Sequence, residues 1–133
     1  EVAGAVIVTT PQDVALADAR KGIEMFRKVG VPILGIVENM AMHVCSQCGH
    51  SEAVFGSKGG SRLAAEYDVE VIGRLALDIQ IREKTDSGDP VVASDPNSAV
   101  ARAYAELAEN VGSAAEHVAA LRAEAPKISI SDD

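Results

Sequence analysis

The sequence predicts an α/β fold of three layers, in which helices flank a parallel β-sheet. Two nearly continuous apolar runs, at residues 2–8 and 31–37, are rich in β-branched side chains. Such runs are typical of parallel strands that are covered on both faces. The segment between them carries apolar residues at helical spacing. The order strand, helix, strand predicts a βαβ unit, whose crossover is right-handed in nearly all proteins.

The helix of this unit has clear start and stop signals. Thr10 is expected to cap its first turn, with Pro11 at the first helical position and Asp13 completing a capping box. Gly30 is expected to end it. The side chains predicted to face the sheet are Leu16, Ala19, Ile23 and Phe26.

Residues 41–57 show neither a continuous apolar run nor helical spacing of apolar residues, and they are expected to form a loop. A short helix is predicted over about residues 60–67, followed by a third strand over residues 69–77. Polar residues interrupt this strand, which favours a place nearer an edge of the sheet. A second short helix over residues 78–85 and a turn at residues 87–90 complete this part of the chain.

The longest helix is expected to begin with Asp95 as its cap. Its apolar stripe comprises Val100, Tyr104, Leu107, Val111, Ala114, Val118 and Leu121. The stripe predicts packing on the sheet, and its heptad-like repeat leaves a partner helix as the alternative. We expect a domain over residues 1–123 and a polar, disordered tail over residues 124–133.

Composition narrows the classes of function. The net charge is −8, with 12 Lys and Arg against 20 Asp and Glu, which argues against nucleic acid and anionic membranes as partners. No apolar run approaches the ~18 residues of a membrane-spanning helix, and no basic, then apolar, leader opens the chain. The two closely spaced cysteines indicate reduced thiols, so we expect a cytoplasmic protein.

Cys45 and Cys48 form the sharpest motif of the sequence. A Cys-x-x-Cys spacing lets both sulfurs face one metal ion or cluster from a tight turn. Zinc and iron–sulfur clusters normally take four protein ligands. His43 and His50 lie close to the two cysteines in the sequence, but it is sterically awkward for all four side chains to bind one ion. The pattern therefore favours two chains that share the metal on a two-fold axis. A redox dithiol and a chance pair of small residues are the alternatives.

Two further features of the sequence bear on ligand binding. The glycine-rich segment at residues 56–61 does not match the phosphate-loop pattern, so it is interpreted as the entry to a helix, with anion binding as the lesser alternative. Asn39 directly follows a buried strand, at the sheet edge where open α/β folds bind ligands. Its amide suits the edge of an adenine ring, although asparagine is also common in turns.

Together, several motifs resemble the Mrp family, also called ApbC. They run in order from about residue 3 to residue 112: VIVTTPQDVAL (6–16), KGIEMF (21–26), GIVENM (35–40), CSQCG (45–49), FG (55–56), LD (77–78), IRE (81–83), GDPV (88–91) and SDP (94–96). Proteins of this family are deviant P-loop ATPases, related to the ParA and MinD partitioning ATPases. They act as homodimeric carriers of iron–sulfur clusters.

The resemblance implies specific roles. Cys45 and Cys48 match the motif that binds a four-iron–four-sulfur cluster between two subunits, with apo iron–sulfur proteins as recipients. Asn39 matches the residue thought to read the adenine of ATP, and Leu77 and Asp78 match a segment near that base. In the family, binding and hydrolysis of ATP with magnesium are coupled to loading or release of the cluster. Zinc is a possible substitute at the thiol pair.

The sequence departs from the family by carrying no Walker A loop, switch region or Walker B aspartate. The chain also begins at Glu1 within an apolar stretch, so we expect it to be the second half of an ATPase domain, with a sheet edge left exposed. Alone it is expected not to hydrolyse ATP. Two rival interpretations are a fragment of a ParA- or MinD-type partitioning ATPase and a zinc-bridged structural dimer.

Overall fold

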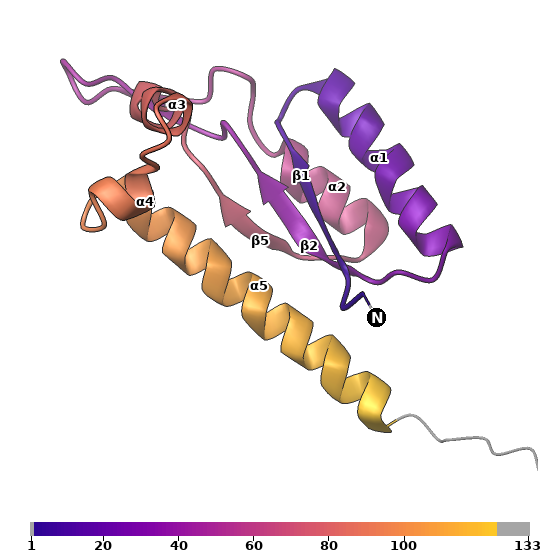
Figure 1. Cartoon of the computed structure of the whole chain (residues 1–133). Helices are drawn as coiled ribbons and strands as arrows, with labels where there is room; N and C mark the ends of the chain where they lie inside the picture. Colours follow the sequence, from indigo (N-terminus) through magenta and orange to yellow (C-terminus); the bar gives the residue numbers. More distant parts are fainter. Residues whose placement is uncertain (1, 125–133) are drawn as a thin grey trace, which may run out of the picture.

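The computed structural model describes residues 2–124 and has the predicted α/β architecture (Figure 1). Three parallel strands form a sheet in the order β1-β2-β5, and two short antiparallel strands, β3 and β4, form a separate hairpin. The strands are β1 (Ala5–Thr9), β2 (Ile33–Glu38), β3 (His43–Val44), β4 (Ser51–Glu52) and β5 (Val71–Arg74). The helices are α1 (Asp13–Lys28), α2 (Gly59–Tyr67), α3 (Ile79–Asp86), α4 (Val91–Ser94) and α5 (Ala99–Glu124).

Strand β2 is the centre of the fold, because its last four residues are buried on both faces of the sheet. Ile36 faces a cluster that includes Leu16 of α1 and Leu63 of α2. Val37 faces the opposite cluster, to which α5 contributes Leu107. Helices α1 and α2 therefore cover one face and α5 the other, as Figure 1 shows. Because both faces of β2 are covered by helices, successive residues of the strand are apolar, and the strand appears in the sequence as a continuous apolar run.

The outer strands differ from the expectation in extent and in burial. Strand β1 begins at Ala5 rather than at residue 2, and Val8 is 62% exposed, so the prediction that both faces of this run are covered is wrong for Val8. Within the described chain β1 pairs with β2 alone, which places it at an edge of the sheet. Strand β5 is shorter than predicted and lies at the other edge.

Helix α1 starts later than its sequence signals indicate. It begins at Asp13, and Gln12 at the cap position makes no side-chain cap hydrogen bond. The hydroxyl of Thr10 instead donates to the side-chain oxygen of Gln12 (2.9 Å), so the predicted capping box is wrong. The predicted end is confirmed, since the helix ends at Lys28 and Gly30 takes the left-handed φ of 71° that glycine favours.

Helix α5 is also capped differently from the prediction. Asp95 closes α4, and α5 begins at Ala99, where the hydroxyl of Ser98 accepts a hydrogen bond from the Ala101 N–H (3.1 Å). The stripe packs on the sheet as predicted along the first half of the helix, and Leu121 near its end is 56% exposed. No helix among residues 2–124 is both long and apolar enough to span a membrane. Helix α5 includes Glu124, and the rest of the predicted tail lies outside the described residues.

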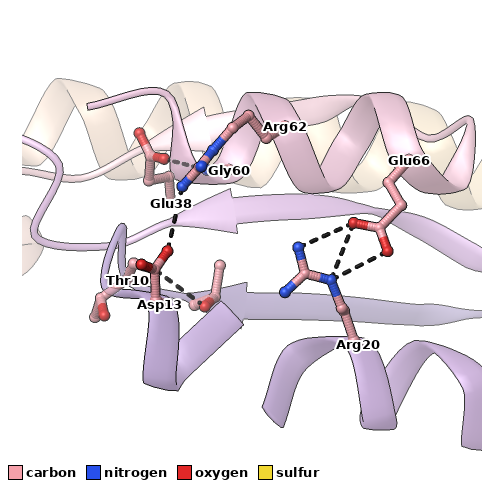
Figure 2. Close-up of polar contacts among 8 residues, drawn as sticks. Thr10, Asp13, Arg20, Glu38, Gly60, Arg62 and Glu66 are labelled. Atoms are coloured by element: carbon pink, nitrogen blue, oxygen red, sulfur yellow. Dashed lines mark hydrogen bonds and ion pairs between the residues drawn. The ribbon is translucent and has the colours of Figure 1, made fainter. Parts of the chain in front are cut away.

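A buried carboxylate joins the sheet to its covering helix. Glu38 ends β2 and is 4% exposed, and its Oε2 accepts a hydrogen bond from the backbone N–H of Gly60 in the first turn of α2 (Figure 2). Its Oε1 lies 3.5 Å from Nε of Arg74 at the end of β5. Figure 2 also shows the exposed ion pair between Arg20 of α1 and Glu66 of α2 (3.0 Å). Exposed pairs of this kind contribute little, about 0–1 kcal/mol.

The close approach of Gly60 to Glu38 yields a stability prediction. A Cβ on Gly60 would lie 2.8 Å from the Glu38 carboxylate oxygen, so we expect Gly60→Ala to lower the free energy of unfolding by about 1–3 kcal/mol. Gly22 in α1 is the control, because a Cβ there meets nothing within 4 Å. We expect Gly22→Ala to raise the free energy by about 0.5–1 kcal/mol. Urea denaturation measures both, and equal effects would contradict the packing described.

Candidate metal centre at the hairpin

The hairpin that carries both cysteines is attached to the sheet by hydrogen bonds beyond Glu38. Met40 takes a left-handed φ of 55° and turns the chain out of β2. The N–H of Ala41 then donates to the Leu75 carbonyl (2.9 Å), and the N–H of Leu77 donates to the Met42 carbonyl (2.9 Å). Nδ1 of His43 lies 3.1 Å from the Leu77 carbonyl oxygen. The segment that leads to Cys45 is therefore paired with the chain that leaves β5.

The Cys-x-x-Cys motif forms the tight turn of this hairpin, as predicted. The prediction of a loop over residues 41–57 is wrong at residues 43–44 and 51–52, which form β3 and β4. The N–H of Cys45 donates to the His50 carbonyl (2.9 Å), and the N–H of Gly49 donates back to the Cys45 carbonyl (2.8 Å). Gly49 takes the left-handed φ of 71° that this closure requires. Cys45 is half-buried and Cys48 is exposed, and both are free thiols. Both cysteines thus lie at the surface, outside the hydrophobic core.

Hydrogen bonds within the turn stabilise the thiolate form of Cys45. The backbone N–H of Cys48 is the strongest influence that lowers the pKa of the Cys45 thiol, followed by the N–H of Gln47 and the side chain of Cys48. Partial desolvation raises the pKa, and the nearby His43 lowers it slightly, so that the net pKa is below that of an ordinary thiol. A thiolate is the form of cysteine that binds a metal.

The described chain supplies an incomplete set of metal ligands. Among residues 2–124, no group of three or more His, Cys, Asp or Glu side chains is arranged to hold a metal ion. In this conformation, His43 and His50 therefore do not come together with the two thiols around one metal ion. His43 is instead directed to the Leu77 carbonyl. A four-coordinate metal or cluster on Cys45 and Cys48 therefore needs ligands from outside the described residues.

The residues expected near a nucleotide lie on the same edge of the sheet but line two different cavities. Asn39 borders a shallow cavity beside β1, and its Oδ1 accepts a hydrogen bond from the Met40 N–H (2.9 Å). Leu77 and Asp78 border a second cavity beyond β5. Asp78 also caps α3, since its Oδ1 accepts a hydrogen bond from the Gln80 N–H (2.8 Å).

In the glycine-rich segment before α2, one backbone donor already has a partner within the chain. The N–H of Gly60, which a phosphate at this helix end would need, donates to the carboxylate of Glu38. This N–H is therefore not available to a phosphate in this conformation. This role of Glu38 was not predicted, although an acidic residue at the end of a buried strand was a signal for it.

The thiol chemistry yields a second prediction. In a Cys48→Ser variant, which keeps the backbone N–H at residue 48, we expect Cys45 to be alkylated by iodoacetamide with a pH midpoint below the ~8.5 of an ordinary cysteine. In urea, where the turn no longer fixes the N–H groups, the midpoint should return to that value. A rate measurement from pH 5 to 10 compares the two states, and identical midpoints would contradict the proposed thiolate stabilisation.

Both the sequence and the fold of this chain are similar to those of known proteins. The profile of the ParA family described as NUBPL iron-transfer P-loop NTPase matches residues 1–112. An iron-sulfur cluster carrier protein from Pseudomonas fragi is 60% identical over 111 residues, which cover 84% of this chain and 39% of the relative. The chain thus spans less than half the length of that relative.

Two solved structures share the fold. The cell division ATPase MinD of Pyrococcus furiosus superposes with a TM-score of 0.64 at 29% identity, over 83% of this chain and 42% of MinD. A nucleotide-binding protein from Archaeoglobus fulgidus in complex with ADP superposes with a TM-score of 0.56 at 40% identity, over 65% of this chain and 35% of that protein. The profile match, which covers most of the chain, places this chain in the ParA family of NUBPL iron-transfer P-loop NTPases.

Proposed function

We propose that two copies of this chain hold one four-iron–four-sulfur cluster between their Cys45 and Cys48 pairs and deliver it to apo iron–sulfur proteins. The observation that carries this proposal is the turn itself, which presents two thiols at the surface, one of them stabilised as a thiolate, with no third ligand in reach within the described chain. Two such turns supply the four thiolates that a cluster of this kind takes. The cluster is cargo rather than a resident cofactor.

The position of the turn supports delivery as well as binding. Cys48 is exposed, so a thiolate of a recipient protein can approach the iron atoms and replace the carrier's ligands one at a time. The hairpin strands β3 and β4 have two residues each and pair only with one another, so exchange at the turn leaves the hydrophobic core undisturbed. Free, exposed thiols also require a reducing compartment, which favours the cytoplasm. Zinc is the substitute metal that the same thiol pair would accept.

We also propose that Asn39, Leu77 and Asp78 contact the adenine of a bound nucleotide in a longer protein of this family. All three follow neighbouring parallel strands at the carboxyl edge of the sheet, where α/β folds bind such ligands. The NH₂ group of Asn39 has no partner among the described residues and can donate to a ring nitrogen. The phosphate groups and magnesium would be held by residues other than these, and we assign no hydrolytic residue to this chain.

The cluster proposal is tested with two variants of neighbouring residues. After anaerobic reconstitution with iron and sulfide, we expect Cys45→Ala to lose the visible cluster absorbance and the bound iron, because the turn then offers only one thiolate. His50→Ala is the matched control, since its side chain is on the same exposed turn and is not a proposed ligand. Iron and sulfide content, together with sedimentation velocity, measure loading and dimerisation.

The outcomes of this experiment separate the alternatives. Loss of iron and of the dimer in Cys45→Ala, with both retained in His50→Ala, agrees with a cluster shared between two chains. Loss of iron in His50→Ala would contradict the ligand set, because a single chain would then be using a histidine. Retention of an iron-loaded dimer in Cys45→Ala would contradict the proposal directly.

The nucleotide proposal requires a longer protein in which a phosphate-binding loop precedes this chain. In that protein we expect Asn39→Ala to weaken ADP binding about 5- to 30-fold, the loss of one or two hydrogen bonds of about 1 kcal/mol each. Asn110→Ala is the control, because that amide donates to the Ile72 carbonyl on the α5 side of the sheet. Calorimetric titration with ADP measures both, and an unchanged affinity in Asn39→Ala would remove Asn39 from the site.

A further inference from the structure

A shallow groove lies at the end of the sheet opposite to the hairpin, between α5 and the loop that joins α1 to β2 (Figure 1). Its volume is about 550 Å³. Its lining residues are Arg27, Gly30, Val31, Pro32, Val118, Leu121 and Arg122. Leu121 is 56% exposed, so the α5 side of the groove is uncovered in the described chain. Neither the cysteine turn nor the residues proposed to contact a nucleotide line this groove.

The groove is apolar, with cations at its rim and no acidic lining residue among residues 2–124. Arg27 is exposed, and one of its N–H groups donates to the Tyr67 carbonyl oxygen. A guanidinium has five N–H donors, so Arg27 can still pair with a carboxylate. On the α5 side, Arg122 donates to the Val2 carbonyl oxygen (2.8 Å). The groove is therefore suited to an apolar segment that also carries a negative charge.

The chain itself continues from this groove into residues 125–133, which follow α5. Glu124, the last residue of α5, lies six residues after Val118, which corresponds to about 9 Å of helix rise. Pro126 disfavours a helical conformation at the preceding residue, so its position favours a change of direction after α5. An extended segment of about nine residues spans up to about 30 Å. Residues 125–133 are therefore long enough to fold back past Val118.

The sequence of this segment, APKISISDD, complements the groove. Ile128 and Ile130 are separated by one residue, so in an extended chain both side chains point to the same side. Two aspartates follow at residues 132 and 133. The segment thus combines an apolar side with negative charge, which are the two properties that the groove accepts. The proposed carrier function uses neither isoleucine.

We propose that residues 127–133 bind in this groove as an extended segment of the same chain. Ile128 and Ile130 cover the apolar wall formed by Val118 and Leu121, and the aspartates at residues 132 and 133 pair with Arg27. The inference goes beyond the proposed carrier function and does not rest on it.

The covalent link favours this segment over a separate partner or a second copy. A segment joined to the groove by a few residues has an effective concentration in the millimolar range, so even a weak contact is populated. The groove has seven lining residues, whereas a stable interface between two copies takes about 20–30 residues a side. An exchange of tails between two copies is the competing arrangement, and it becomes an outcome of the test.

NMR of the full chain with ¹³C-labelled methyl groups tests the contact. We expect nuclear Overhauser effects between the methyl groups of Ile128 or Ile130 and those of Val118 or Leu121. In the double variant Ile128→Ser with Ile130→Ser, these effects should vanish and the methyl shifts of Val31, Val118 and Leu121 should change, because the apolar side of the segment is lost.

The matched control is the double variant Ser129→Ala with Ser131→Ala, which changes the opposite side of the same extended segment. It should leave the methyl shifts of the groove in place. Absence of the nuclear Overhauser effects in the unsubstituted chain would overturn the proposal. Equal shift changes in the two double variants would overturn it as well.

Charge variants of the segment test its pairing with Arg27. We expect Asp132→Asn with Asp133→Asn to lower the ratio of bound to unbound segment about 2- to 5-fold, as for an exposed ion pair. Glu106→Gln with Glu109→Gln is the control, because it removes the same charge from exposed positions of α5 that do not line the groove. The methyl shifts of the groove, averaged between the two states, measure the ratio. Equal ratios in the two double variants would overturn the assignment of the carboxylates.

An equal mixture of ¹³C-labelled and unlabelled chains shows whether the segment binds to its own chain. We expect no nuclear Overhauser effects between the segment of one chain and the groove of another. Their presence would overturn the proposal in favour of exchanged tails.

Reconstitution of the same samples with iron and sulfide separates this inference from the carrier function. A chain that loads a cluster and shows no contact in the groove would overturn the inference alone. A chain that shows the contact and loads no cluster would contradict the carrier function and support the inference.

Discussion

The buried carboxylate of Glu38 is the constraint on which the candidate site depends. Removing a carboxylate from water is costly unless its charge is compensated, and here the N–H of Gly60 and the guanidinium of Arg74 compensate it. One side chain thereby fixes the start of α2 and the end of β5 relative to β2. The backbone carbonyl of Glu38 also accepts a hydrogen bond from the Leu75 N–H (3.0 Å). Interactions of both the side chain and the backbone of Glu38 therefore fix the point at which the chain leaves the sheet.

The placement of the cysteines follows from that exit point. Directly after Glu38 the chain turns at Met40 and pairs with the segment that leaves β5. The hairpin extends from this pairing and ends in a turn whose own N–H groups stabilise the Cys45 thiolate. The fold thus separates a rigid, buried framework from an exposed thiol pair. That separation suits the proposed cargo, because the thiols lie outside the hydrophobic core.

Local patterns in the sequence predicted the features that depend on local chemistry. The βαβ unit, the short helix now seen at Gly59–Tyr67 and the cysteine turn all follow from apolar periodicity, glycine and spacing. The features that were wrong or missed depend on which partner a polar side chain takes, and the residue type alone does not fix that partner. Thr10 has the residue type of a cap but bonds to Gln12, and Glu38 finds its partners at residues 60 and 74. Asn39 and Asp78 border separate cavities. Neither the segment around Asn39 nor the segment around Asp78 contains a pattern that predicts this.

The central claim is that the two thiols of one chain form half of a site completed by a second chain. Native mass spectrometry after anaerobic reconstitution with iron and sulfide tests it most directly, because it reports the number of chains and the mass of the bound metal in one species. The account predicts a dimer that carries one four-iron–four-sulfur cluster. A monomer that carries a complete cluster, or a monomer without metal, would contradict the shared site. A dimer that carries only zinc would agree with the shared site and contradict the cluster as its occupant.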